Sequence, residues 1–236
     1  MDLSLPHPTP PGLLDGCSGL HLCPELADII HQLAESLGNA VDARDHCTRS
    51  HSQEVAEVAQ ILTLELGLSP AVARLIHVAG HLHDLGKIGL PDDLLFKPRP
   101  LNEAESITLR EVPLITCRIL EPLHVFNTEI SIIRHLREWW DGNGTPDGLR
   151  GAEIPLGSRL LAVTEAFDSL TCNRAYRPGR TIDEALAELR TYADRQFDPQ
   201  FVELLAETIE RQKTRWQERV NQARVELASV APAKSA

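Results

Sequence analysis

The chain has 236 residues and a mass of 26.1 kDa, which is long enough for one large domain and excludes a small disulfide-stapled fold. Lysine and arginine number 23 against 34 aspartates and glutamates, so the net charge is −11. This balance argues against broad electrostatic binding to DNA, RNA or an anionic membrane, and we expect neither kind of partner.

Residues 1–23 are rich in proline and glycine and lack apolar periodicity, which predicts a flexible N-terminal arm. The same stretch has no basic region ahead of an apolar run, so it does not fit a secretory signal. No apolar run approaches the roughly 20 residues of a membrane-spanning helix. The five cysteines contain no C-x-x-C pair, so we expect ordinary thiols and a cytoplasmic protein.

Helical periodicity begins near Glu25 and recurs along the first half of the chain. A second helix is expected over 55–66, ending at Gly67. A Ser-Pro pair at 69–70 is typical of an N-cap and first turn, and the helix it opens closes near Gly86. The apolar face of the first helix is expected to consist of Leu26, Ile29, Ile30, Leu33 and Leu37.

The middle of the chain continues the helical pattern. Asn102 and Glu105 resemble a capping box, Pro113 restarts a helix, and residues 130–140 form a further apolar helical run. The stretch 141–155 is rich in glycine and proline, which predicts a long irregular loop. Long structured loops in compact domains are often functional.

Three more helices are expected in the last third of the chain. The first covers 158–172. The second begins at a capping box of Thr181 and Glu184, and the third begins at the Asp-Pro pair 198–199. Because strand signals are almost absent, the sequence predicts an all-α bundle of roughly eight helices.

The domain division follows from these patterns. We expect one helical domain over 24–212, preceded by the arm. The polar, alternately charged segment 213–236 is expected to extend the last helix and then fray.

One group of residues carries candidate chemistry. His83 and Asp84 are adjacent at an expected helix end, and His51 lies about one helix earlier. An imidazole nitrogen beside a carboxylate oxygen suits Zn, Mn or Fe. Glu165 and Asp168 stand three residues apart and project from one helix face. A lone His-Asp pair is more often a helix cap or a surface ion pair. The metal-site interpretation therefore depends on the order of all these residues along the chain.

That order on a helical scaffold resembles the HD superfamily of metal-dependent phosphohydrolases. Four segments narrow the resemblance to its HD-GYP branch, over residues 45–206: HDLGKIGLPDDLLFKPRPLNEAE, EWWDGNGTPDGLRGAEIPLGSRLLAV, AFDSLTCNRAYRPGRTIDEAL and FDPQFVELL. The resemblance implies an HD-domain helical bundle that uses a divalent metal to hydrolyse cyclic di-GMP or a related nucleotide.

The resemblance also implies a role for each matching residue. The implied metal ligands are His51, His83, Asp84 and Glu165, the last standing where the family has aspartate. The implied catalytic residues are Lys87, at the place of the lysine that contacts the scissile phosphate, and Asp84. The implied substrate contacts are Thr145, Asp168, Arg174 and Arg177.

Several family positions are replaced in this chain. Cys47 stands where the resemblance expects a glutamate, and Val112 where it expects a histidine. Leu136 and Arg137 stand in place of a pair of histidines, and Thr145 in place of the tyrosine of GYP. Valine and leucine cannot coordinate a metal, and an arginine cation repels a second ion. We therefore expect one Fe, Mn or Zn ion per chain.

Two functions remain open from the sequence. The retained His-Asp pair and Lys87 favour a metal-dependent phosphodiesterase. The replaced ligand positions favour a degenerate module that binds a cyclic dinucleotide, or a partner such as a diguanylate cyclase domain protein, without hydrolysis.

His77 and His81 have the spacing of a two-histidine metal clip. The resemblance places neither at the centre, so we expect packing residues.

Overall fold

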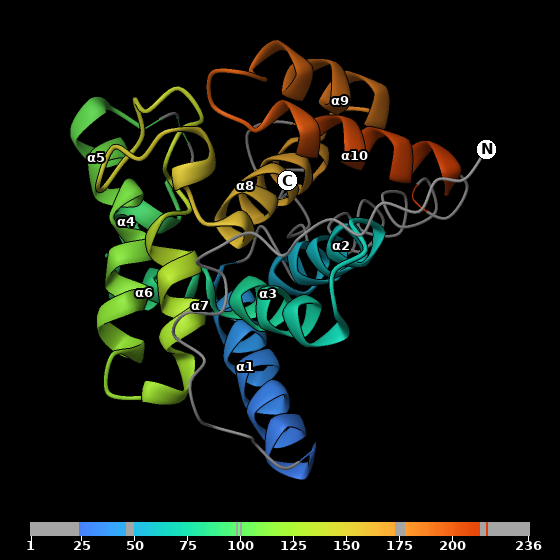
Figure 1. The fold of residues 1–236 in the computed structure, drawn as a ribbon. Helices are drawn as coiled ribbons and strands as arrows, with labels where there is room; N and C mark the ends of the chain where they lie inside the picture. Colours follow the sequence, from blue (N-terminus) through green and yellow to red (C-terminus); the bar gives the residue numbers. More distant parts are fainter. Residues whose placement is uncertain are drawn as a thin grey trace, which may run out of the picture.

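The computed structural model describes residues 24–45, 50–97, 99, 101–172, 178–212 and 216. Over this part the chain forms ten α-helices and three short 3-10 helices with no strand (Figure 1). The all-α prediction is therefore confirmed, with more helices than the expected eight. The expected arm 1–23 lies outside the described residues, as does the expected extension 213–236 apart from residue 216.

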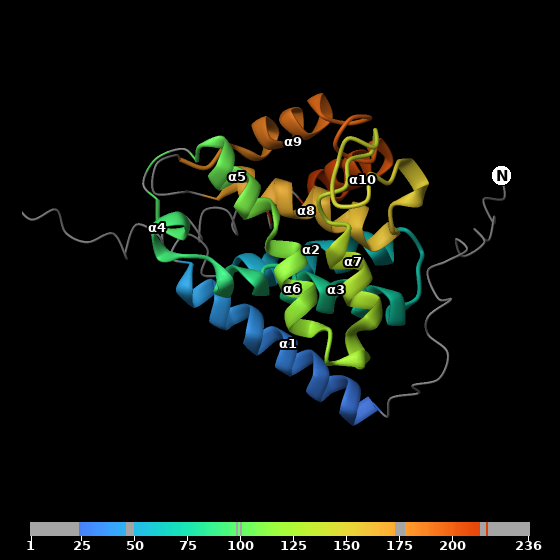
Figure 2. The same cartoon turned by 90° about the vertical axis from the view of Figure 1, so that its left-hand side faces the viewer.

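The first three helices form the base of the fold. They are α1 (Pro24–Arg44), α2 (His51–Glu65) and α3 (Pro70–Leu82). Figure 2 shows α1 running along the outside of the molecule beneath α3. A 3-10 helix, η1 (Leu85–Gly89), follows α3 directly.

Two glycines allow these helices to approach one another closely. A Cβ added at Gly80 of α3 would lie 2.6 Å from the Cα of Ala56 in α2. A Cβ at Gly38 of α1 would lie 2.7 Å from the carbonyl oxygen of His81 in α3. Both distances are shorter than real Cβ contacts, so any larger residue would push the helices apart.

The remaining helices complete the bundle around a core shared with α2 and α3. Helices α6 and α7 lie together on one side of the bundle, and α8, α9 and α10 lie together on another (Figures 1 and 2). This core contains large side chains that are almost fully buried. They include Leu62, Ile76, Leu82, Leu160 and Leu205. The bounds are α4 (Asp92–Leu95), α5 (Glu103–Arg110), α6 (Val112–Leu120), η2 (His124–Phe126), α7 (Asn127–Arg134), η3 (Gly151–Glu153), α8 (Leu156–Thr171), α9 (Ile182–Thr191) and α10 (Pro199–Arg211).

The predicted helix starts are confirmed by their caps. The side chain of Ser69 accepts a hydrogen bond from the backbone N–H of Val72. The capping boxes that begin with Asn102 and Thr181 are both complete. Gly67, just beyond α2, has a φ of +74°, which a residue with a side chain rarely adopts.

Two local predictions were wrong. Three members of the expected buried face of α1, Leu26, Ile29 and Leu33, are 41%, 59% and 48% exposed, because the first half of α1 projects beyond the other helices (Figure 1). The expected helix over 130–140 ends at Arg134. Beyond it the chain turns, and the backbone N–H of Trp140 bonds to the carbonyl of Gln196 instead of continuing the helix.

Among the described residues, no helix combines the length and apolar character needed to cross a membrane.

Candidate metal centre

Four elements bring the predicted metal ligands and their neighbours together. His51 is the first residue of α2, and His83 and Asp84 form the junction between α3 and η1. Lys87 lies within η1, and Asp168 lies on α8. The tight Gly80 contact between α2 and α3 keeps the start of one helix beside the end of the other.

His51, His83 and Asp84 make a compact buried set, which we call the HD centre. Their ligand atoms all lie within 4.8 Å of one another. The Nε2 atoms of His51 and His83 are each 3.5 Å from the same oxygen of Asp84, Oδ2. Two imidazole nitrogens and one carboxylate oxygen are a ligand set for a borderline divalent cation.

The proton positions of His83 fit this role. Its Nδ1 lies 2.6 Å from the carbonyl oxygen of Gly80, which can only accept, so Nδ1 carries the proton. Nε2 is the ring nitrogen left for a ligand, and it is buried with no hydrogen-bond partner. A buried ring nitrogen next to a carboxylate is the environment that a metal ion satisfies.

His51 is oriented from its other side by Asp168. The Nδ1 of His51 lies 2.5 Å from Oδ2 of Asp168, and Nε2 faces Asp84. Burial by itself lowers the pKa of His51, but the charges of Asp168 and Asp84 raise it to about 9. A carboxylate behind a histidine in this way fixes the ring and strengthens it as a ligand.

Lys87 places a positive charge at the edge of the HD centre. Its Nζ lies 2.7 Å from Asp84 Oδ2 and 2.8 Å from Asp45 Oδ2. Burial lowers the pKa of Lys87, and Asp84 and Asp45 raise it above the ordinary lysine value. In turn burial raises the pKa of Asp84, while Lys87, His83 and His51 hold it well below its usual range. Both groups are therefore charged at neutral pH.

The end of α1 supports this arrangement, a role the sequence reasoning missed. The Arg44 guanidinium donates to the carbonyl oxygens of Lys87, Ile88 and Leu90, each at 2.9 Å. It also pairs with Asp92 at 2.7 Å. Arg44 thereby holds the backbone of η1 in place beneath Lys87.

Asp42 has a similar role on the α2 side. Its Oδ2 accepts hydrogen bonds from the backbone N–H and the hydroxyl of Ser52, next to His51, at 3.0 and 2.7 Å. The signal for these residues was the cluster Asp42, Arg44 and Asp45 shortly before His51.

Glu165 is placed differently from the other expected ligands. Its Oε1 accepts from the Arg137 guanidinium at 2.8 Å, and it is not part of the compact donor set found among the described residues. Val112 and Leu136, at two replaced ligand positions, are buried in the core, 2% and 3% exposed.

The expected substrate contacts divide into three groups. Asp168 faces His51 and the thiol of Cys172. Thr145 lines a cavity of about 250 Å³ together with the arginines Arg110, Arg134 and Arg137. Arg174 and Arg177 lie outside the described residues.

The loop 141–155, called here the signature loop, is fixed by one buried carboxylate. Glu138 accepts three backbone N–H groups, from Asp147 at 2.7 Å and from Gly148 and Leu149 at 3.1 Å. Gly144 is required there, because a Cβ would lie 2.1 Å from the backbone nitrogen of Trp139. The loop therefore holds Thr145 in a defined position.

Comparison with known proteins places this arrangement in a family. The profile of the HD domain matches residues 35–201. The cyclic di-GMP phosphodiesterase response regulator RpfG of Xanthomonas campestris is 38% identical over 171 residues, 72% of this chain and 45% of that protein. The 3'3'-cGAMP-specific phosphodiesterase 2 of Vibrio cholerae is 35% identical over 192 residues, 80% of this chain and 36% of that protein. The chain thus spans less than half the length of these relatives.

Solved structures agree on the fold. An HDG"Y"P protein from Bdellovibrio bacteriovorus superposes with a TM-score of 0.60 at 21% identity, over 79% of this chain and 65% of that chain. A cyclic GMP-AMP specific phosphodiesterase of V. cholerae superposes with a TM-score of 0.61 at 21% identity, over 81% and 53%. With the family profile and the HD centre in agreement, the chain belongs to the HD domain family.

Proposed function

We propose that the protein is a metal-dependent phosphodiesterase that hydrolyses a cyclic dinucleotide. The observation that carries this proposal is the HD centre, in which a buried unpaired nitrogen of His83 faces the carboxylate of Asp84. The charged Lys87 lies beside it. Relatives named as phosphodiesterases of cyclic di-GMP and 3'3'-cGAMP support the choice of substrate class.

His51, His83 and Asp84 would hold the metal ion. When bound, Zn, Mn or Fe supplies Lewis-acid polarisation of a phosphoryl oxygen and lowers the pKa of coordinated water. Lys87 contributes a fixed positive charge where negative charge develops on the phosphoryl oxygens. Asp45 and Asp84 keep that ammonium group in place, and Asp168 acts as a positioning residue through His51.

Substrate binding depends on local positive charge, because the chain as a whole carries −11. The cavity with Thr145 at its wall is lined by three arginines and by Glu111. Arg134 and Arg137 pair with Asp147 and Glu165, so a phosphate would compete with these carboxylates for the two parallel hydrogen bonds that arginine offers. Arg174 and Arg177 are proposed as further phosphate contacts only because their sequence segment resembles the matching segment of the HD-GYP branch.

One ion at the HD centre is the proposed occupancy. Arg137 places its guanidinium on Glu165, and the side chains of Val112 and Leu136 offer no donor atom. A second ion beside them would be repelled by the positive charge of Arg137 and would have too few ligand atoms to bind it.

A second candidate function is binding without hydrolysis, to a cyclic dinucleotide or to a diguanylate cyclase domain protein. The Arg137–Glu165 pair supports it, because a carboxylate held by arginine is less available to a metal.

The test is hydrolysis of cyclic di-GMP, 3'3'-cGAMP and bis(p-nitrophenyl) phosphate with Mn²⁺, Fe²⁺ or Zn²⁺, beside calorimetric titration of each dinucleotide. We expect turnover in the parent and in the control Asp93→Asn, which changes an exposed acid on α4. Turnover should be lost in Asp84→Asn and in Lys87→Gln.

Binding without any product in the parent would overturn the enzyme and select the second candidate. If that binding disappears in an Arg174→Ala, Arg177→Ala double variant, these two arginines hold the ligand. If the protein neither binds nor hydrolyses any of these compounds, both the enzyme and the cyclic-dinucleotide form of the second candidate are contradicted.

A further inference from the structure

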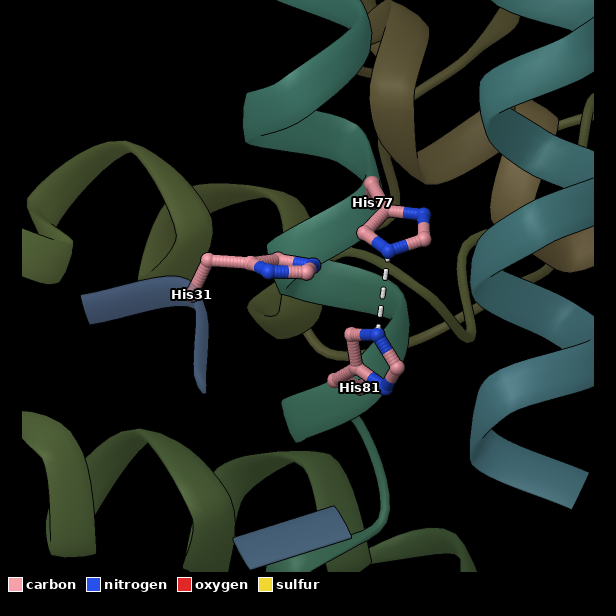
Figure 3. A group of neighbouring side chains, drawn as sticks. All are labelled: His31, His77 and His81. Carbon is pink, nitrogen blue, oxygen red and sulfur yellow. Dashed lines mark hydrogen bonds between the residues drawn. The ribbon is translucent and has the colours of Figure 1, made fainter. Parts of the chain in front are cut away.

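A second group of histidines lies between α1 and α3. His77 and His81 stand one turn apart on α3, and His31 reaches them from α1 (Figure 3). One ring nitrogen from each lies within 4.8 Å of the others. His77 and His81 are buried and His31 is half-buried, so the group is reachable from one side. We call these three residues the histidine cluster.

The hydrogen bonding within the cluster is incomplete. The Nε2 atoms of His77 and His81 face each other at 3.0 Å, as the dashed line in Figure 3 shows. Two imidazole nitrogens at this distance either share one ring's own N–H in a hydrogen bond or are both ligands of a metal ion. If they share an N–H, the accepting ring carries its own proton on Nδ1. The Nδ1 atom of His81 is buried without a hydrogen-bond partner, so the arrangement in which His81 accepts buries an unpaired donor. The ring of His77 has the backbone of Ala56 as a hydrogen-bond partner.

Burial lowers the pKa of His77 and of His81, and the neighbouring histidine rings lower both further. Glu57 of α2 acts in the opposite direction on both rings, and Glu35 of α1 does so on His77. These two carboxylates are the negative charges near the cluster that would partly balance a bound cation. Three histidines from two helices, with i and i+4 spacing on one of them, are a known way to build a zinc site.

We propose that His31, His77 and His81 form a second divalent metal site, distinct from the HD centre, that takes Zn²⁺ or a similar imidazole-preferring ion. Bonds of about 2.0–2.1 Å in a tetrahedral site place ligand nitrogens roughly 3.3 Å apart. The observed 3.0 Å between His77 and His81 is within a small side-chain movement of that value.

The two sites use opposite faces of the same helix end. His81 and His83 are two residues apart, so their side chains point about 200° apart around α3. His81 faces α1 and His83 faces His51 of α2. An ion in the histidine cluster would tie α1 to α3 without touching substrate. Because Arg44 and Asp45 at the end of α1 hold η1 and Lys87, it would stabilise the support of the HD centre.

The experiment uses the full chain, purified without a histidine tag and stripped with a chelator. A His51→Gln, Asp84→Asn background disables the HD centre. We expect this protein to bind about one Zn²⁺ per chain, to give the visible absorption of four-coordinate Co²⁺, and to melt at a higher temperature with the ion. Adding His31→Gln should weaken binding by 10- to 100-fold and remove both effects. The matched control is His124→Gln, which changes an exposed histidine of η2 and should alter nothing.

In the otherwise unchanged chain, His31→Gln should lower the metal content from about two ions to about one. A His77→Gln variant should do the same, which keeps the proposal testable if one substitution impairs folding as judged by circular dichroism. The proposal is wrong if the disabled background binds no Zn²⁺ or Co²⁺ at micromolar concentrations. The proposal is also wrong if the folded His31→Gln and His124→Gln proteins bind Zn²⁺ with the same affinity.

Discussion

At the scale of single residues, the HD centre depends on what stands behind each ligand. His83 is oriented by the carbonyl of Gly80, one turn earlier in its own helix, whereas His51 is oriented by Asp168 from a helix more than 100 residues later. The first partner is local and follows from the helix itself. The second requires α8 to pack against the start of α2.

Replacing Asp168 with asparagine tests this second partner. Asp168→Asn keeps the size of the side chain but removes the charge that acts on His51. We expect the metal affinity of the HD centre to fall by roughly 10- to 100-fold, measured by metal titration of a His31→Gln background so that only this centre is counted. Activity should recover in part at high metal concentration. An affinity equal to that of the Asp93→Asn control would show that Asp168 does not position His51.

At the scale of elements, the site is built where helices nearly touch and where the signature loop is held. The α2–α3 contact is set by the backbone at Gly80 and Ala56, and the loop is set by the carboxylate of Glu138. Neither contact involves a metal ligand, yet both fix where ligands and Thr145 lie.

Substituting Gly80 distinguishes helix propensity from packing. In an exposed helix, glycine to alanine stabilises by about 1 kcal/mol. At Gly80 the new methyl group would lie 2.6 Å from the Cα of Ala56, so we expect Gly80→Ala to lower the free energy of unfolding by about 1–3 kcal/mol. Urea unfolding measures it. The control Ala71→Gly, at an exposed position of α3, should cost no more than about 1 kcal/mol. A stabilised Gly80→Ala protein would contradict the close approach.

Glu138 offers a matching test for the signature loop. Glu138→Gln replaces one acceptor oxygen with an N–H₂ group that faces a backbone N–H donor. We expect a loss of about 1.5–3 kcal/mol, as for hydrogen bonds to a charged group, and faster proteolysis within 141–155. The exposed control Glu121→Gln should match the parent in urea unfolding and proteolysis. Unchanged protection of the loop would mean that other contacts hold it.

At the scale of the whole molecule, stability responds to pH through a buried acid that belongs to neither candidate metal site. Glu129 of α7 is 4% exposed and its Oε2 has no hydrogen-bond partner. Burial raises its pKa from 4.5 to about 7. The folded state thus binds this proton more tightly than the unfolded state does. The contribution of Glu129 to the free energy of unfolding therefore falls as pH rises from about 4.5 to 7, and is constant above that range.

Glu129→Gln should remove this dependence, because the amide stays neutral. The pKa difference corresponds to roughly 3 kcal/mol, so we expect the variant to be more stable than the parent by up to that amount at pH 8 and by much less at pH 5. Urea unfolding at both pH values checks this, with Glu121→Gln as control. Parallel pH curves for Glu129→Gln and the parent would show that Glu129 ionises normally in the folded protein.

The sequence by itself determined the features that depend on near neighbours along the chain. Caps at Ser69, Asn102 and Thr181 were predictable, since each acts within one turn. The pairing of His83 with Asp84 at a helix end was predictable for the same reason. The all-α class followed from apolar periodicity summed over many segments.

Only the tertiary structure decided the contacts between distant segments. Periodicity predicts that α1 has an apolar face but cannot say which turns find a neighbour, and so Leu26 and Leu33 are exposed. It also could not show that Asp168 lies behind His51, or that His31 reaches the His77–His81 pair. The physical reason is that these contacts depend on how the helices cross, which is set by close packing across the whole core and not by any one segment.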